Sequence, residues 1–248
     1  MPEGHLTHRH AREQHADLGG RVVRAAGPQG RFDAGPYDGR ALRSVEALGK
    51  HLLYHFDGAP AVHVHLGMRG IFLRYPDPGT PPRAGTRLRL ATDDVAYDLI
   101  APSTCEQLDA DGVAALRASL GPDPLRDDAP EEEAVRRLRA FRGPVGAAVL
   151  DQKVWAGVGN AWRAELLFLT GLHPGARDLD AATAGRLWEA ARTYMALGRD
   201  AGQVVSDPAA PDERWVYKRE HCRRCGAAVL TWQLASRTAY ACPVDQPG

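Results

Sequence analysis

A change of hydrophobic period partway along the chain limits its possible folds more than any other feature. From residue 21 to about residue 99, apolar and polar residues alternate with a period of two, as in half-buried strands. After about residue 105, apolar residues recur at helical spacing. This order predicts an α+β fold in which an antiparallel β-sandwich precedes a helical region. The alternation is seen in Val62, Val64 and Leu66, in Leu88 and Leu90, and in Val95, Tyr97 and Leu99.

Four segments are expected to be helices because they combine helical periodicity with start and stop residues. Residues 3–17 hold helix formers and end at Gly19-Gly20, and Asp180 is a plausible N-cap for the last helix. The other three expected helices begin at Asp109 or Asp111 and end near Gly121, run from Glu131 to Phe141, and run from Asp180 to Leu197.

Composition places the expected boundaries between domains. The acidic, proline-rich stretch 121–130 is interpreted as a linker, and 201–214 is interpreted as a loop. We therefore expect an N-terminal β-sandwich domain at 1–120, a helical domain at 125–205 and a small metal module at 214–248.

Charge and composition exclude some classes of protein. The chain of 248 residues is 44% apolar and has no apolar run of 18 residues, which argues against a membrane span. Its start, MPEGHLTHRHAR, lacks the apolar region of a signal peptide, so a cytoplasmic protein is expected. The net charge of zero argues weakly against nucleic-acid binding, although basic residues are concentrated in 212–240. The excess of arginine over lysine suits phosphate binding, but it equally suits a GC-rich genome.

Three of the four cysteines lie near the C-terminus with the spacing of a zinc site. The pattern is Cys222-x2-Cys225-x16-Cys242-x2-Asp245, in which two short turns can present four ligands to one Zn²⁺ ion. Asp245 is favoured as the fourth ligand, and His221, a water molecule or a chain without zinc are the alternatives. Cys105 fits no motif and is expected to be a buried free thiol.

The N-terminal residues Met1-Pro2-Glu3-Gly4 can carry amine chemistry. Removal of Met1 exposes the secondary amine of Pro2, whose pKa of roughly 7.7–8 leaves part of it unprotonated at neutral pH. Attack of this amine on a sugar C1′ gives a cationic iminium, and Glu3 can move protons beside it. The alternative is that Pro-Glu is only a good helix start.

The segment Gly157-Val158-Gly159-Asn160 has the composition of an anion-binding turn before a helix. Asn160 is a good N-cap, which predicts that the first backbone N–H groups of the helix point at a phosphate. No Gly-Lys-Ser follows, so the segment is not an ATP-binding loop. Such turns are also common as purely structural features.

Together these motifs resemble the formamidopyrimidine-DNA glycosylase/endonuclease VIII family over nearly the whole chain. The resemblance implies a β-sandwich domain with an N-terminal helix, then a helix–two-turns–helix domain with a zinc finger, with damaged DNA as the partner. The order and separation of the motifs are more specific than any one of them. They are MPEG, GKHLLYHF (49–56), VHLGMRG (64–70), LGPDPL (120–125), LDQKVWAGVGNAWRAELL (150–167) and CRRCG…RTAYACPVDQ (222–246).

The resemblance also implies roles for individual residues. Pro2 is expected to be the Schiff-base nucleophile and Glu3 the proton donor, and Lys50 is expected to contact phosphate near the lesion. Glu165 matches an acid behind the active site. The expected DNA contacts are a phosphate contact from His65, backbone contacts from Asn160 and Arg237, and Met68 in the gap left by the flipped base. The alternatives are a solvated strand residue for Lys50 and His65, a core residue for Met68 and an ordinary finger-surface arginine for Arg237.

Departures from the family pattern bear on the substrate. The branch that acts on oxidised purines usually ends a strand with Asp-x-Arg-Arg-Phe-Gly, whereas this chain has Tyr97-Asp98-Leu99-Ile100-Ala101-Pro102. The loop before the finger is also short, and position 6 is leucine where many members have glutamate. The expected activity is therefore that of a monomeric glycosylase with β,δ-elimination AP lyase activity on oxidised pyrimidines, in duplex or single-stranded DNA. The rivals are an AP lyase with little glycosylase activity and a silent damage-binding protein.

Overall fold

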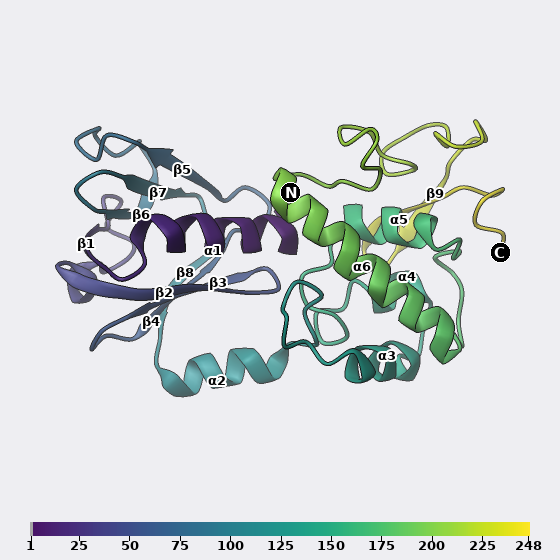
Figure 1. Cartoon of the computed structure of the whole chain (residues 1–248), viewed down its shortest axis with the longest axis horizontal. Coiled ribbons are helices and arrows are strands. Elements are labelled where there is room, and N and C mark those ends of the chain that lie inside the picture. Colours follow the sequence, from purple (N-terminus) through teal and green to yellow (C-terminus); the bar gives the residue numbers. More distant parts are fainter. Residues whose placement is uncertain (1) are drawn as a thin grey trace. The chain divides into compact units, whose positions relative to one another are not determined.

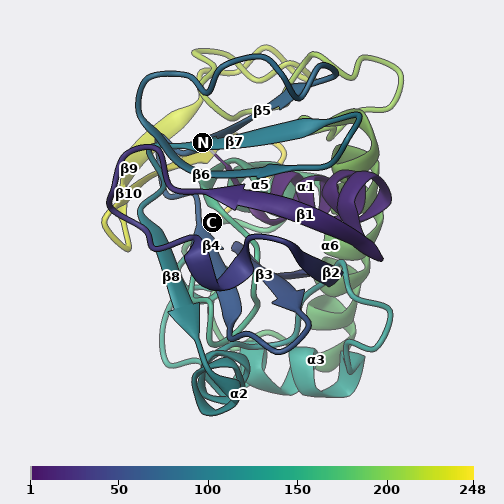
Figure 2. The ribbon, with the colours of Figure 1, turned by 90° about the vertical axis from the view of Figure 1, so that its left-hand side faces the viewer.

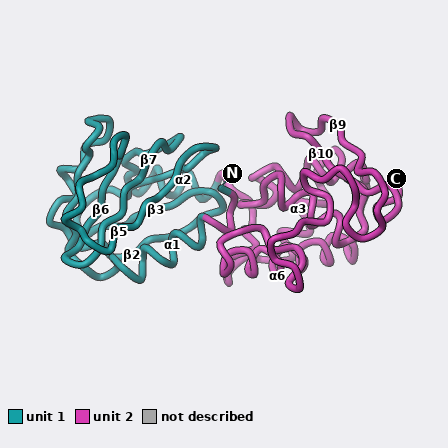
Figure 3. Tube along the Cα trace, turned by 90° about the horizontal axis from the view of Figure 1, so that it is seen from above, with its two compact units in different colours: residues 1–2, 7–118 teal, residues 3–6, 119–248 magenta. Residues whose placement is uncertain are grey.

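A computed structural model describes residues 2–248 of the chain. The expected removal of Met1 concerns a residue outside this range. The chain divides into two compact units, coloured separately in Figure 3. Unit 1 contains Pro2 and Thr7–Ala118, and unit 2 contains Glu3–Leu6 and Ser119–Gly248. Within residues 2–248, no helix is both long enough and apolar enough to cross a membrane.

Unit 1 is built on eight antiparallel strands in the order β5-β7-β6-β1-β2-β3-β4-β8. The first half of β1 pairs with β2 and its second half pairs with β6, so that β1 is shared by a group of four strands, β5-β7-β6-β1, and a group of five, β1-β2-β3-β4-β8. In Figure 2, β5, β7, β6 and β1 lie one below another. The strands are β1 (Arg21–Ala26), β2 (Arg40–Leu48), β3 (His51–Phe56), β4 (Ala61–His65), β5 (Ile71–Tyr75), β6 (Thr86–Ala91), β7 (Ala96–Ile100) and β8 (Thr104–Leu108).

The core of unit 1 lies between the two groups of strands and helix α1 (Gly4–Leu18). Leu52, Val62 and Val64 from one group join Leu88 and Leu90 from the other in a single buried cluster, to which α1 contributes Ala11 and Leu18. The predicted alternation is present in β4, but the polar position His63 is also buried, because its imidazole lies between His51 and Glu106. A short 3-10 helix (Gly35–Tyr37) and α2 (Ala110–Ser119) complete this unit.

Unit 2 is mainly helical (Figure 1). Its helices pack around a second apolar cluster. Trp155, Trp162 and Trp188 are its largest fully buried side chains. The predicted N-cap of the last helix is confirmed, since the Asp180 carboxylate accepts a hydrogen bond from the Thr183 amide. The helices are α3 (Glu131–Ala140), α4 (Val145–Ala148), α5 (Asn160–Leu169) and α6 (Ala181–Ala201).

The stretch 121–130, which has the composition of a linker, belongs to unit 2. Residues 122–125 are buried in unit 2, and the segment is hydrogen-bonded to the loop before α5. The Gly121 amide donates to the Gln152 carbonyl at 2.8 Å, and the Ala156 amide donates to the Pro122 carbonyl at 2.9 Å. The break between the units therefore falls at 118/119, before the proline-rich stretch.

The C-terminal end of unit 2 is a two-stranded hairpin of β9 (Leu230–Leu234) and β10 (Arg237–Ala241). It packs against α5 through a small cluster that includes Ala164, Phe168 and Cys242. The mixed fold confirms the predicted α+β class, with a sandwich-like strand region before a helical region.

Candidate active site

The carboxylate of Glu3 is buried against the first turn of α5. Its side chain is 1% exposed, and it accepts hydrogen bonds from the backbone amides of Gly159 at 3.1 Å, Ala161 at 2.9 Å and Trp162 at 3.3 Å. A helix N-terminus favours an anion because its first N–H groups lack partners within the helix. The chain's own carboxylate therefore occupies the anion site at the start of α5.

This arrangement corrects the prediction made for the Gly-Val-Gly-Asn turn. Gly159 is the N-cap and Asn160 is the first helical residue, so Asn160 does not cap the helix. The backbone amides at the start of α5 are not left for a phosphate, because the Glu3 carboxylate already accepts hydrogen bonds from them. The glycine at 159 is required by the close approach, since a Cβ there would lie 2.2 Å from Cδ of Glu3.

Asn160 instead contacts the C-terminal hairpin. Its Nδ2 donates a 3.1 Å hydrogen bond to the Thr238 carbonyl, next to Arg237 at the start of β10. Its Oδ1 is buried and has no hydrogen-bond partner among residues 2–248. The Arg237 side chain is exposed. Within unit 2, Asn160 is therefore hydrogen-bonded to the hairpin at the residue that follows the finger arginine, Arg237.

The predicted residues of unit 1 lie at the ends of β3 and β4. Lys50 lies in the turn before β3, and His65 is the last residue of β4 and pairs with His51. Burial lowers the pKa of His65, and the Lys50 charge lowers it further, so the imidazole is neutral at pH 7. Its Nδ1 lies 3.1 Å from the Gly67 amide nitrogen and 2.8 Å from the Ser103 hydroxyl oxygen. Met68 is 66% exposed, which rules out the core alternative for this methionine.

The cysteine pattern is brought together as a cluster able to hold a metal ion. The ligand atoms of Cys222, Cys225, Cys242 and Asp245 all lie within 4.8 Å of one another. Asp245 Oδ2 is 3.3 Å from Cys222 Sγ and 3.2 Å from Cys242 Sγ. Three thiols and one carboxylate are an acceptable donor set for a tetrahedral ion. His221 is not part of this cluster.

Known proteins match this chain along most of its length. The model of the formamidopyrimidine-DNA glycosylase N-terminal domain matches residues 1–100, and that of the H2TH domain matches 120–207. Endonuclease 8 1 of Mycobacterium tuberculosis is 39% identical, over 99% of this chain and 100% of that protein. The chain belongs to the formamidopyrimidine-DNA glycosylase/endonuclease VIII family. The predicted resemblance is thereby confirmed.

Two further proteins of this glycosylase family are similar to the chain. The formamidopyrimidine-DNA glycosylase of Deinococcus radiodurans is 33% identical, over 84% of this chain and 83% of that protein. The solved structure of the Lactococcus lactis enzyme with DNA containing an abasic site has a TM-score of 0.81 and 22% identity, over 99% of this chain and 100% of that one. At this identity the likeness supports the fold.

Glu165, matched from the glycosylase family motif, is a fully buried acceptor of four hydrogen bonds. The backbone amides of Trp215, Val216 and Tyr217 donate to it at 2.8–3.0 Å, and the Ser206 hydroxyl donates to it as well. The carboxylate therefore fixes the path of the chain between α6 and the cysteine module. The sequence of 201–214 has the composition of a loop, and it did not predict that Glu165 would hold this segment by hydrogen bonds.

Two residues of this glycosylase were not predicted from sequence. His5 is 1% exposed, and its Nδ1 accepts from the Trp162 indole at 2.9 Å. Arg163 is 1% exposed and its guanidinium contacts backbone carbonyls of the finger hairpin. In the sequence, Arg163 is a charged residue within a largely apolar helix, and this pattern could have indicated a buried, hydrogen-bonded guanidinium. No pattern in the sequence distinguishes His5 from the other nine histidines.

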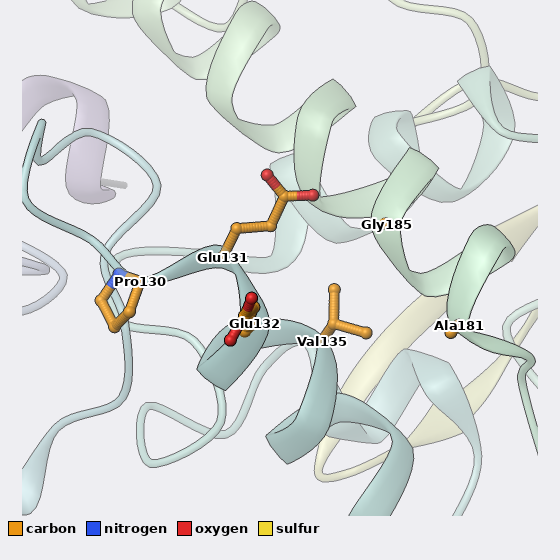
Figure 4. A pocket seen from close by; sticks show the side chains of 6 residues that line it. All are labelled: Pro130, Glu131, Glu132, Val135, Ala181 and Gly185. Atoms are coloured by element: carbon orange, nitrogen blue, oxygen red, sulfur yellow. The ribbon is translucent and has the colours of Figure 1, made fainter.

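A pocket in unit 2 holds none of the predicted site residues. It lies between the first turns of α3 and α6 (Figure 4) and is lined by two carboxylates, Glu131 and Glu132, with Pro130, Val135, Ala181 and Gly185. An acidic lining repels DNA phosphates. This pocket is therefore not the candidate active site.

Proposed function

We propose that this protein is a bifunctional DNA glycosylase and AP lyase of base-excision repair, with Pro2 as its nucleophile. Membership of the glycosylase family supports the repair function. The observation that carries the catalytic proposal is the placement of the Glu3 carboxylate, which follows Pro2 directly and is oriented by three backbone amides. A helix start alone would not need this carboxylate to be buried.

The proposed reaction begins when the unprotonated Pro2 amine attacks C1′ of the damaged nucleotide. The bond from C1′ to the base breaks, the base leaves with a proton, and a cationic iminium joins Pro2 to C1′. Loss of a C2′ proton then expels the 3′-phosphate by β-elimination, and δ-elimination releases the 5′-phosphate. Hydrolysis of the iminium regenerates the amine. Glu3 is proposed to donate the proton to the opening sugar ring.

The DNA contacts proposed for this reaction come from both units. Lys50 and His65 supply cationic and neutral donors for phosphates, and the exposed Met68 supplies an apolar side chain for the gap in the stack. Asn160 and Arg237 are proposed to contact the backbone from unit 2. The complex of the Lactococcus lactis relative with abasic DNA supports a damaged-DNA partner.

We propose Zn²⁺ as the ion of the Cys222, Cys225, Cys242 and Asp245 cluster. The thiolate-rich donor set suits zinc, and the ion would hold together the two turns from which the hairpin extends. No step of the proposed reaction uses the ion. We also propose domain limits of 1–120, 125–205 and 214–248 for the sandwich, the helical region and the finger.

Oxidised pyrimidines are the proposed substrates. Residues 97–102, which include the end of β7, lack the Arg-Arg-Phe group of the oxidised-purine branch. The 39% identity to a protein named endonuclease 8 agrees with this departure. The proposal therefore distinguishes this chain from relatives named for formamidopyrimidines.

Borohydride trapping tests the proposal. Purified protein is incubated with a duplex carrying one abasic site, and separately with a duplex carrying 5-hydroxyuracil, beside the variant Pro2→Ala. Removal of Met1 is checked by mass spectrometry. A covalent adduct on both substrates with wild type only is the expected result.

The other outcomes separate the rivals. An adduct on abasic DNA alone identifies an AP lyase with little glycosylase activity. No adduct from a protein that lacks Met1 and still binds the DNA would identify a damage-binding protein, and the catalytic proposal would be abandoned.

A further inference from the structure

Arg163 is a buried cation whose guanidinium donates its hydrogen bonds to backbone carbonyls. It lies one helical turn after Gly159 in α5, and its side chain is 1% exposed. Burial lowers its pKa to about 10, which leaves the guanidinium protonated at neutral pH. A buried charge is unfavourable unless hydrogen bonds compensate for the lost water. The partners of this guanidinium therefore indicate what it does.

Those partners are backbone carbonyls at the end of the finger hairpin. Nη1 donates to the Leu234 carbonyl at 3.0 Å, and Nη2 donates to the Thr238 carbonyl at 2.7 Å. Longer contacts of 3.4 Å reach the carbonyls of Arg237 and Gly146. Arg163 thus contacts the residues on both sides of the hairpin turn and links them to the helical part of unit 2.

The turn that Arg163 holds is an unfavourable one for its sequence. Leu234 pairs with Arg237, which leaves Ala235 and Ser236 as a two-residue turn. Both have left-handed backbone conformations, with φ of 52° and 60°. Such turns favour Asn-Gly, because residues with a Cβ are strained there. Neither Ala235 nor Ser236 relieves this strain in the way that glycine would.

The turn leads directly into Arg237, the arginine proposed to grip DNA. Asn160, from the same face of α5, donates to the Thr238 carbonyl that also accepts from Arg163. One carbonyl therefore ties both α5 side chains to the hairpin at the residue after Arg237. A shift of the turn would move Arg237 and release Asn160 together.

We propose that Arg163 is a positioning residue that holds the strained Ala235-Ser236 turn and so sets the place of Arg237 on DNA. The inference rests on the proposed DNA-repair function. Arg163 would thus affect DNA binding without contacting DNA itself.

The variant Arg163→Met tests the proposal because it keeps much of the side-chain volume and removes every donor. The affinity for a duplex with a tetrahydrofuran abasic analogue is measured by fluorescence anisotropy, and zinc content and thermal unfolding are measured on the same samples. We expect Kd to rise about tenfold, the loss equivalent to one charge-assisted hydrogen bond. Arg192→Met is the matched control, since Arg192 also donates to a backbone carbonyl in unit 2, that of Arg126, away from the finger.

A rescue separates positioning from general structural damage. Ala235→Asn with Ser236→Gly supplies residues that adopt this turn without help. Added to Arg163→Met, these changes should return Kd to within about threefold of wild type. In the otherwise unchanged protein they should leave it unaltered. If Arg163→Met does not fold, Arg163→Lys, which keeps the charge but not the forked donors, takes its place with the same rescue.

Two results would overturn the proposal. One is wild-type affinity in Arg163→Met. The other is a folded, zinc-loaded Arg163→Met whose weakened binding the new turn does not restore. The backbone amide shifts of Ser236 and Arg237, measured by NMR without DNA, report the turn directly, so the inference about Arg163 stays testable even if wild-type protein forms no adduct in the trapping experiment.

Discussion

The indole Nε1–H of Trp162 donates a 2.9 Å hydrogen bond to Nδ1 of His5, and both side chains are buried in unit 2. The rings meet edge to face at a centroid distance of 5.4 Å. Because Nδ1 accepts, the hydrogen of the neutral imidazole is on Nε2, which is buried and has no partner among residues 2–248. His5 is thus held neutral two residues after Glu3.

This relationship predicts a specific loss of stability in acid. Burial lowers the pKa of His5 to about 3 from 6.5, so between these values the unfolded chain binds a proton that the folded chain does not. The free energy of unfolding should fall as the pH falls through this window. At about pH 4.5 the loss due to His5 is on the order of 2 kcal/mol relative to about pH 7.

The variant His5→Asn isolates this contribution, since its amide oxygen can still accept from Trp162. Urea unfolding at the two pH values should show a smaller difference for His5→Asn than for wild type. His173→Asn, at a half-exposed imidazole, is the control and should behave as wild type. An unchanged difference in His5→Asn would contradict the assignment.

A second prediction concerns the fit between Gly159 and Glu3. In Gly159→Ala the new Cβ would lie 2.2 Å from Cδ of Glu3, so the carboxylate must leave the amides of α5. We expect a loss of about 2–4 kcal/mol in stability and at least about a tenfold slower rate of adduct formation with abasic DNA.

Gly185→Ala is the matched control for this substitution. Gly185 lies in α6, and a Cβ there would be no closer than 3.9 Å to Glu131. Alanine should stabilise the helix by about 0.5–1 kcal/mol and leave the adduct rate unchanged. A Gly159→Ala protein with the wild-type rate of adduct formation would show that the position of Glu3 does not matter for the reaction.

Local patterns in the sequence predict those parts of the fold that depend on neighbouring residues. The alternation at Val62–Leu66 gives β4, Asp180 caps α6, and the cysteine spacing gives the metal cluster. In each case the partner is close in sequence or the periodicity alone selects the conformation.

Contacts between distant residues explain what the sequence does not predict. Asn160 has the propensity of an N-cap, yet Gly159 is the N-cap of α5. Gly159 can serve because the Glu3 carboxylate, 156 residues earlier in the chain, accepts hydrogen bonds from the amides at the start of the helix. The stretch 121–130 has a linker's composition, but its residues 122–125 are buried, and hydrogen bonds from Gly121 and to Pro122 join it to the loop before α5. Tertiary partners override local propensity at these positions.

The buried carboxylate of Glu165 gives a third prediction. Glu165→Gln replaces one acceptor oxygen by an NH2 group that faces the backbone donors of 215–217. We expect a loss of about 2 kcal/mol in stability and faster hydrogen exchange of the Trp215 amide. Glu189→Gln, at an exposed carboxylate of α6, should change neither quantity. Unaltered exchange at Trp215 would show that the loop before the finger is held by other contacts.

The last prediction concerns the metal cluster and its fourth ligand. Purified protein should contain one zinc ion per chain, and Asp245→Ala should weaken zinc binding by roughly tenfold or more, because it removes a ligand from the cluster. His221→Ala should bind zinc as wild type does, since His221 lies outside the cluster. Asp245→Cys should bind zinc more tightly, because thiolate is the softer ligand.

Competition with a chromogenic chelator measures these affinities, and DNA binding is followed in parallel. Removal of zinc should weaken DNA binding while unit 1, whose core is separate, remains folded. Loss of zinc from His221→Ala, with retention in Asp245→Ala, would assign the fourth position to the histidine. Full DNA affinity in the zinc-free protein would mean that the hairpin carrying Arg237 is held by its contacts with α5 alone.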